Sequence, residues 1–291
     1  MSSVTVETPR AADASAFQNY VGHSEIVRSR ISEAPVELLA ALLDRRFDDM
    51  SPSRTLPSLW HWLIVPSPAR QSEIGPDGHP KRGGFLPPIA FPRRMFAGSR
   101  IRFIAPLHVG DEVKRTTTIK SITPKSGRSG NLIFVTLVHA IEGPRGPALT
   151  EEQNLVFRDT GGPKSTPTES LVDRGKPGGF AVVETVHPDP VFLFRYSAAT
   201  VNSHRIHYDL EYVRNVEGYP NLIVHGPLQA IMLADLATRH LRRPLSAFEF
   251  RILKPVFLGS PFYCAAREED GKTLLQTLDA VHDVCTSATA E

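Results

Sequence analysis

The sequence predicts an α+β protein of two similar halves, each a helix covered by a curled antiparallel sheet. Strand-like runs rich in Val, Ile, Thr and Phe, broken by Gly/Pro turns, follow a helical segment in each half. In addition, "RFIAPLHVGD" (Arg102–Asp111) matches "RILKPVFLGS" (Arg251–Ser260), with Arg, Pro and Gly in register 149 residues apart. A helix wrapped by a sheet and doubled in one chain is the double hot-dog form.

The bulk properties exclude several function classes. A net charge of +2 over 291 residues, without a basic block, argues against nucleic-acid binding. Cys264 and Cys285 form no metal-binding spacing, so we expect reduced thiols and no metal. The N-terminus lacks a signal pattern, and no apolar run approaches the roughly 20 residues of a membrane span. We therefore expect a cytoplasmic protein without membrane contact.

The first half, which we place at residues 1–160, is expected to begin with helices. "SEAPVELLAALLDRRFD" (Ser32–Asp48) has a one-sided apolar stripe, and "LPSLWHWLIVPSP" (Leu56–Pro68) indicates a short buried helix. "GPDGHPKRGGFLPP" (Gly75–Pro88) predicts a long loop that could act as a lid. Strands are predicted across 100–124, 130–143 and 147–159.

The second half, at residues 181–291, follows a Gly/Pro/Ser/Thr-rich linker at 161–180. "GPLQAIMLADLATRHL" (Gly226–Leu241) begins with Gly-Pro and has helical apolar spacing, so it predicts the covering helix of this half. Strands are expected in Ala247–Glu269, and the segment around Cys285 has the composition of a polar tail.

A dense polar window, "FRYSAATVNSHRIHYD" (Phe194–Asp209), precedes that helix. His207 can act as a general acid or base near neutral pH, and Asn202 can hold a water molecule without ionising. Gly226 places a free amide at a helix N-terminus, which suits an oxygen with developing negative charge. Together these residues predict activation of water for addition across a double bond conjugated to a carbonyl.

Other polar residues in this region have open roles. We expect substrate contacts from His204, His225 and Tyr196, with turn capping, loop orientation and packing as the respective alternatives. Asp209 could set the tautomer of a nearby histidine. Ser197 and Ser203 lack the setting of a nucleophile elbow, which makes a serine hydrolase a weak interpretation.

The window, followed by "GYPNLIVHGPL", resembles the hydratase motif of the MaoC-like, (R)-specific enoyl-CoA hydratase superfamily. The most similar branch is the double hot-dog one, with mesaconyl-C4-CoA hydratases, itaconyl-CoA hydratases and hydroxyacyl-thioester dehydratases type 2. "PRRMFAGSRIRFIAPLHVGD" resembles the N-terminal signature of that branch. The superfamily usually has an Asp five residues before its His; here Asn202 stands in that place and His204 where Asn is common.

The resemblance implies an acyl-CoA hydratase or dehydratase, with coenzyme A as part of the substrate and no separate cofactor. We expect hydration of itaconyl-CoA or mesaconyl-C4-CoA to citramalyl-CoA, with Arg205, Arg93 or Arg94 binding the free carboxylate. Arg242, Arg243 and Lys254 are candidates for the CoA phosphates. A homodimer remains open. The alternatives are a hot-dog thioesterase, an (R)-3-hydroxyacyl-thioester dehydratase on unbranched chains, and a non-catalytic acyl-CoA or acyl-carrier-protein binding module.

Overall fold

A ten-stranded antiparallel sheet organises the chain, in the order β1-β3-β4-β5-β2-β7-β10-β9-β8-β6. The computed structural model describes residues 14–50, 53–64, 69–127, 130–158, 172–269 and 271–291. Its strands are β1 (Ser24–Arg30), β2 (Arg93–Phe103), β3 (Glu112–Gly127), β4 (Gly130–Gly143), β5 (Gly146–Arg158), β6 (Val182–Val186), β7 (Ala247–Ile252), β8 (Phe262–Glu269), β9 (Lys272–Leu278) and β10 (Val284–Ala290). Five strands come from each half, in matching order outward from the β2–β7 seam.

An approximate two-fold axis passes through this seam. Arg100 of β2 pairs with Glu249 of β7, and these two positions are themselves 149 residues apart, the spacing of the sequence repeat. Their side chains form a bidentate ion pair, with Nε–Oε2 at 3.0 Å and Nη2–Oε1 at 2.9 Å. The duplicated architecture predicted from the repeat is therefore confirmed, and the two halves join edge to edge into one sheet.

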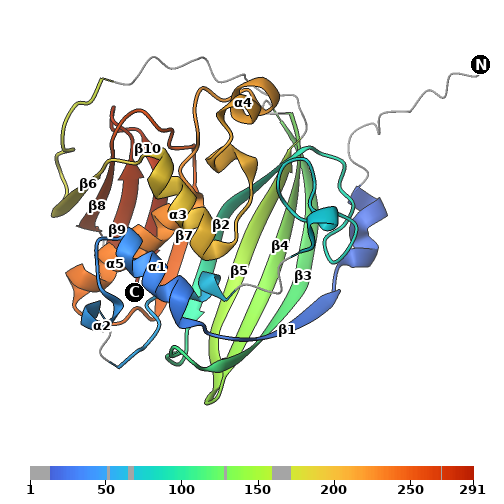
Figure 1. Cartoon of the computed structure of the whole chain (residues 1–291), viewed down its shortest axis with the longest axis horizontal. Coiled ribbons are helices and arrows are strands. Elements are labelled where there is room, and N and C mark those ends of the chain that lie inside the picture. Colours follow the sequence, from blue (N-terminus) through green and yellow to red (C-terminus); the bar gives the residue numbers. More distant parts are fainter. Residues whose placement is uncertain (1–13, 51–52, 65–68, 128–129, 159–171, 270) are drawn as a thin grey trace, which may run out of the picture.

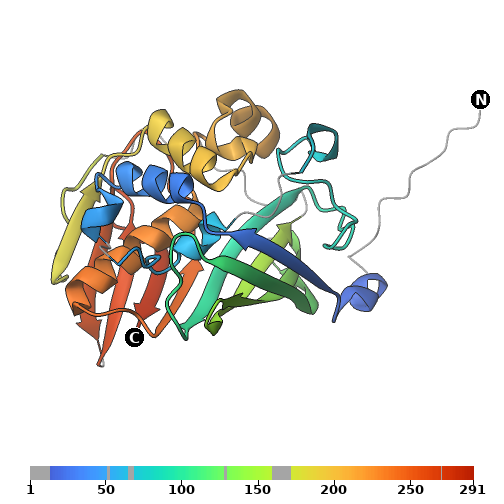
Figure 2. The ribbon, with the colours of Figure 1, turned by 60° about the horizontal axis from the view of Figure 1, so that its bottom comes forward.

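The helices lie on one face of the sheet and mainly over the second-half strands (Figures 1 and 2). They are α1 (Glu33–Leu42), α2 (Phe47–Met50), α3 (Pro190–Thr200), α4 (Leu210–Tyr212) and α5 (Gly226–Leu241), with 3₁₀ turns η1 (Ala14–Tyr20), η2 (Trp60–Leu63), η3 (Gln71–Glu73) and η4 (Arg205–His207) and a π turn, η5 (Val213–Glu217). The predicted bounds of α5 are confirmed, and Leu228, Ile231 and Leu236 are buried against the sheet. The Gly-Pro start and the apolar stripe thus predicted the bounds of this helix correctly.

The first half has a four-residue turn, η2, where the second half has α5. The chain before each element pairs in the same way: the Leu56 N–H donates to Leu107 O at 2.7 Å, and the Val224 N–H donates to Val256 O at 2.9 Å. Leu107 and Val256 are again 149 residues apart. The short buried helix predicted within Leu56–Pro68 is thus present as η2, and it occupies in the first half the position that the longer α5 occupies in the second.

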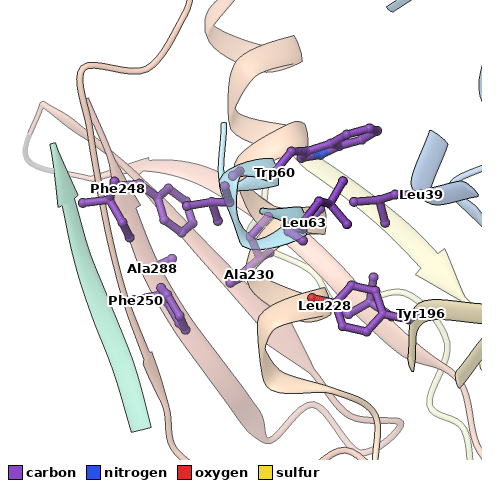
Figure 3. Packing of buried hydrophobic residues seen from close by; sticks show 14 of the residues in the cluster. Leu39, Trp60, Leu63, Tyr196, Leu228, Ala230, Phe248, Phe250 and Ala288 are labelled. Atoms are coloured by element: carbon purple, nitrogen blue, oxygen red, sulfur yellow. The ribbon is translucent and has the colours of Figure 1, made fainter. Parts of the chain in front are cut away.

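The apolar core is formed between these helices and the sheet (Figure 3). One cluster of buried residues joins η2, α1, α5 and β7, and its members include Trp60, Leu63, Leu39, Leu228, Ala230, Phe248 and Phe250. Trp60, Leu39 and Phe248 are fully buried. One continuous core thus unites elements of both halves.

Two sequence-based assignments need correction. Ser24–Arg30, for which no strand was predicted, is the edge strand β1. Cys285 lies in the buried strand β10 between β7 and β9, not in a polar tail. Both cysteines are free and buried, as expected for reduced thiols. Of the predicted linker, residues 161–171 lie outside the described residues, and 172–180 have no regular secondary structure.

Candidate active site

The polar window folds as a helix, a sharp turn and η4. Asp189 caps α3, since its Oδ1 accepts the Phe192 N–H at 2.7 Å, and Pro190 follows at the first helical position. The helix ends at Val201, whose φ of 52° turns the chain. Asn202 and the η4 residue His207 are thereby brought to the lining of one large cleft of about 1960 Å³.

His207 is a buried base with one free ring nitrogen. Its Nδ1 lies 2.8 Å from Ile223 O; because a carbonyl can only accept, Nδ1 bears the proton and Nε2 keeps its lone pair. Burial is the main cause that lowers the pKa of His207 to about 4, against the raising effect of the Ile223 hydrogen bond. At neutral pH the ring is therefore uncharged and can accept a proton.

The positions of Tyr196 and His225 correct the expectation that they contact substrate. Both are fully buried, and neither belongs to the described lining of the cleft. His225 stacks face to face on His207 with ring centroids 3.5 Å apart, and Tyr196 packs edge-on against His225 at 4.7 Å. Ser197 Oγ lies 2.9 Å from His225 Nε2. These residues support the ring of His207 from behind.

Gly226 begins α5 and lines the same cleft as His207. As the first helical residue, its N–H has no acceptor inside the helix, and Pro227 offers no N–H at all. A Cβ at position 226 would lie 2.1 Å from Ile252 Cδ1, so a side chain here would displace a cleft residue. The amide of Gly226 is thus available to an oxygen atom in the cleft.

The segment Gly75–Pro80 docks on the window and brings to it Asp77 and His79, which we did not predict as functional. His79 lines the cleft, and its ring centroid lies 4.1 Å from that of His204. His204 in turn packs edge-on against His207 at 5.6 Å. Burial and the neighbouring His79 lower the pKa of His204 to about 2. The sequence signal was the Asp-Gly-His-Pro turn inside the predicted lid.

The predicted carboxylate-binding arginines differ in their availability. Arg205 pairs with Asp209 at 2.7 Å and stacks on Tyr212, outside the described cleft lining. Arg93 lines the cleft but is paired with Glu217 at 3.1 Å. Arg94 lines the cleft without an ion pair to any described residue, and burial lowers its pKa to about 10, so it remains charged at neutral pH. Of the three predicted arginines, Arg94 is therefore the one whose charge is available in the cleft.

The suggested phosphate-binding residues differ in whether they line the cleft. Arg242 and Arg243 follow α5 as exposed residues outside the described cleft lining. Lys254 does line the cleft, but it is paired with Asp279 at 2.7 Å and Asp283 at 2.6 Å.

Comparison with known proteins identifies the chain's family. The family model for hydroxyacyl-thioester dehydratase type 2 matches residues 59–258, which span η2, both strands of the seam, the window and all of α5. The chain belongs to this family. Family membership makes it a hydro-lyase of the enoyl-thioester hydratase type, and the predicted resemblance is confirmed.

Individual relatives agree with this assignment. The chain is 43% identical over 272 residues to the mesaconyl-C4-CoA hydratase of Chloroflexus aurantiacus, covering 94% of this chain and 96% of that protein. It is similar in fold to the solved structure of HtdX from Mycobacterium tuberculosis, with a TM-score of 0.65, 20% identity and coverage of 92% and 99%. A second M. tuberculosis protein, described as having a double hot-dog fold, matches with a TM-score of 0.54, 14% identity and coverage of 93% and 95%. The predicted α+β double hot-dog fold is confirmed.

In this member of the dehydratase family, the cleft lining includes a cluster of polar side chains around Glu151. Glu151 of β5 is buried and accepts hydrogen bonds from Trp62 Nε1 at 3.1 Å and from Ser99 Oγ, with His61 Nε2 at 3.0 Å. Burial raises its pKa, but the contacts from His61 and Ser99 prevail and hold it at about 2. The charged carboxylate fastens η2 to the sheet of the first half.

Three side chains next to the cleft form a cluster of potential metal ligands. One ligand atom each from Asp77, His79 and His204 lie within 4.8 Å of one another, which is close enough to surround a small cation.

In the described part of the chain, none of the helices is both long and apolar enough to cross a bilayer.

Proposed function

We propose that this chain is an acyl-CoA hydratase that adds water to mesaconyl-C4-CoA and forms citramalyl-CoA. The observation that carries the proposal is that the uncharged His207 ring and the Gly226 amide line one cleft, whose lining also includes Arg94. The 43% identity to a mesaconyl-C4-CoA hydratase supports the choice of substrate.

In the proposed reaction, the thioester carbonyl accepts a hydrogen bond from the Gly226 N–H at the start of α5. His207 Nε2 takes a proton from water as the water oxygen bonds to the carbon that bears the free carboxylate. The π electrons move toward the thioester as an enolate, which the amide and the helix dipole stabilise. His207 then returns the proton to the carbon next to the thioester, and the base is restored.

Arg94 is the residue that we assign to the free carboxylate of the substrate. Its charge remains unpaired among the described residues, and it is near enough to His79 and His204 to affect their charges. A guanidinium can hold a carboxylate through two parallel hydrogen bonds. Such a contact, worth about 1.5–3 kcal/mol, would favour a dicarboxylic substrate over an unbranched one.

The experiment for the reaction incubates the protein with mesaconyl-C4-CoA, itaconyl-CoA, crotonyl-CoA and saturated butyryl-CoA in heavy-oxygen water. We expect labelled citramalyl-CoA from the first substrate at the highest rate. Itaconyl-CoA should react more slowly, because its double bond is not conjugated with the thioester. Free thiol released from butyryl-CoA, without labelled hydroxyacyl product elsewhere, would show a thioesterase instead.

The experiment for the carboxylate compares Arg94→Ala with Arg205→Ala. We expect Arg94→Ala to lower kcat/KM about 10–100-fold for mesaconyl-C4-CoA while changing crotonyl-CoA turnover little. Arg205→Ala is the matched control, since its guanidinium is paired with Asp209 and holds Pro76 O; it should affect both substrates alike. Equal losses for both substrates in Arg94→Ala would reject the assignment.

A further inference from the structure

The side-chain oxygen of Asn202, a residue that we expected to hold water, is already engaged by the backbone of the window. This Oδ1 accepts the N–H of His204 at 3.0 Å, so one of the two lone pairs of this oxygen is already used, and the two amide hydrogens remain as donors. A water molecule that attacks carbon is best aligned when both of its O–H groups meet acceptors. His207 Nε2 provides one acceptor, and an uncommitted ring nitrogen nearby would provide the second.

His79 has the required lone pair. Its Nδ1 lies 3.0 Å from Asp77 Oδ2, and its backbone N–H donates to Asp77 Oδ1 at 3.0 Å. Because an ionised carboxylate only accepts, the Nδ1 proton is committed to Asp77 and Nε2 remains an acceptor. His79 lines the cleft, and its ring contacts that of His204, which in turn contacts that of His207. His79 is also close enough to His207 to lower its pKa.

The segment that bears Asp77 and His79 is fitted closely to the window. The Arg205 N–H donates to Asp77 O at 2.9 Å, and Ser203 Oγ donates to Gly78 O. Gly78 is buried with a φ of +89°, and a Cβ there would lie 1.8 Å from Ser203 O. Only glycine allows this approach, which fixes Asp77 and His79 relative to the residues just before His207.

We propose, on the basis of the hydratase function above, that His79 oriented by Asp77 is a further catalytic residue that holds the attacking water. In this role His79 Nε2 accepts a hydrogen bond from one water O–H, while His207 Nε2 takes the proton of the other. The proton taken by His207 moves on to the carbon next to the thioester. The hydrogen held by His79 stays on oxygen and becomes the product hydroxyl, so no further reactant is needed.

Asp77, His79 and His204 could instead surround a cation, but the positive charges near them oppose it. Arg94 and Arg82 lie close enough to lower the pKa of His79, and Arg94 also lowers that of His204. Two guanidinium charges beside the cluster disfavour a divalent ion. The mutual contact of Asp77 and His79 also already satisfies one atom of each.

The test measures kcat and KM for mesaconyl-C4-CoA in four variants. His79→Ala should lose about 10²–10³-fold in kcat with KM changed less than threefold, because the ring contacts water and not substrate. His79→Gln, whose amide oxygen can replace the acceptor, should recover at least tenfold of that loss. Gly78→Val should lower kcat like His79→Ala by displacing the segment. Lys81→Ala, an exposed residue that bonds Ser72 O in the same loop, is the control and should match the parent.

The outcomes separate this inference from the function on which it depends. If His79→Ala is folded and keeps kcat within twofold while His207→Ala loses activity, the role of His79 is rejected and the hydratase proposal stands. If His207→Ala also keeps full rate, the hydratase proposal itself fails. Should His79→Ala not fold, His79→Gly with added imidazole replaces it, and rescue of kcat supports the role. Loss of parent activity with a chelator and recovery with Zn²⁺ would overturn it in favour of a metal site.

Discussion

At the scale of single residues, the ring of His207 combines burial with a fixed tautomer. Ile223 O binds Nδ1–H, and His225 covers one face of the ring, so the free Nε2 has little freedom to turn. The expectation that His207 and Gly226 serve one cleft came from sequence spacing alone. The stacked support by His225 could not be predicted, because it depends on the course of the chain between the window and α5.

The rate of hydration should be insensitive to pH around neutrality. With a pKa of about 4, His207 is already in its basic form well below pH 6.5, the ordinary pKa of histidine. We expect kcat/KM to be flat from about pH 6 to 8 and to fall toward pH 4. A profile of kcat/KM against pH checks this, and an acid limb centred near 6.5 would mean that the ring of the free enzyme is solvated.

Stability should depend on pH through the same buried histidines. Because the folded pKa of His207 lies below its unfolded value, the unfolded state binds more protons, and stability is lost as pH falls from about 6.5 to about 4. The shift corresponds to about 3 kcal/mol for His207. Denaturant unfolding at pH 7 and at pH 5 measures it, and His207→Gln should reduce the difference. An equal difference in His207→Gln would assign the effect to other groups.

At the scale of elements, regular patterns were predictable and long-range pairings were not. The Gly-Pro start and apolar stripe gave the bounds of α5, because both signals are local. The strand β1 was missed since it pairs with β3, nearly 90 residues later. Its less exposed residues, Glu25, Val27 and Ser29, are mostly polar, so the sequence lacks the apolar/polar alternation of a strand. The docking of Gly75–Pro80 was likewise invisible, because Gly78 meets Ser203 far along the chain.

The turn η2 should depend on the buried carboxylate of Glu151. Replacing Glu151 by Ala leaves the Trp62 and Ser99 donors and His61 without their shared acceptor. We expect a loss of about 3–5 kcal/mol in the free energy of unfolding, as for other broken buried networks. Chemical denaturation measures this loss. The neighbouring Glu152→Ala, which removes only a partly exposed pair with Lys120, is the control and should change stability by less than about 1 kcal/mol.

At the scale of the whole molecule, the repeat explains how two halves form one cleft. The two-fold axis at Arg100 and Glu249 places equivalent strands on both sides of the seam. The halves have then diverged: α5 fills the second, whereas η2 leaves the inner face of the first half's sheet to line the cleft. The sequence repeat predicted the symmetry of the two halves. The replacement of a long helix by η2 in the first half could not be predicted, because it depends on how the side chains pack.

The seam between β2 and β7 should be sensitive to any side chain at Gly98. A Cβ at this bulge position would lie 2.3 Å from Phe250 O across the seam. We expect Gly98→Ala to cost at least about 2 kcal/mol of stability, because backbone on the neighbouring strand cannot yield as a side chain can. Thermal unfolding checks this. Gly178→Ala is the control, since a Cβ there meets nothing within 4 Å.

The most direct measurement is the single-turnover rate of water addition to mesaconyl-C4-CoA by folded His207→Ala protein. If the imidazole is the proton carrier opposite the Gly226 amide, this rate should be about 10²–10⁴-fold below that of the parent chain, with substrate still bound. A His207→Ala protein that forms labelled citramalyl-CoA from heavy-oxygen water at the parent rate would contradict the account.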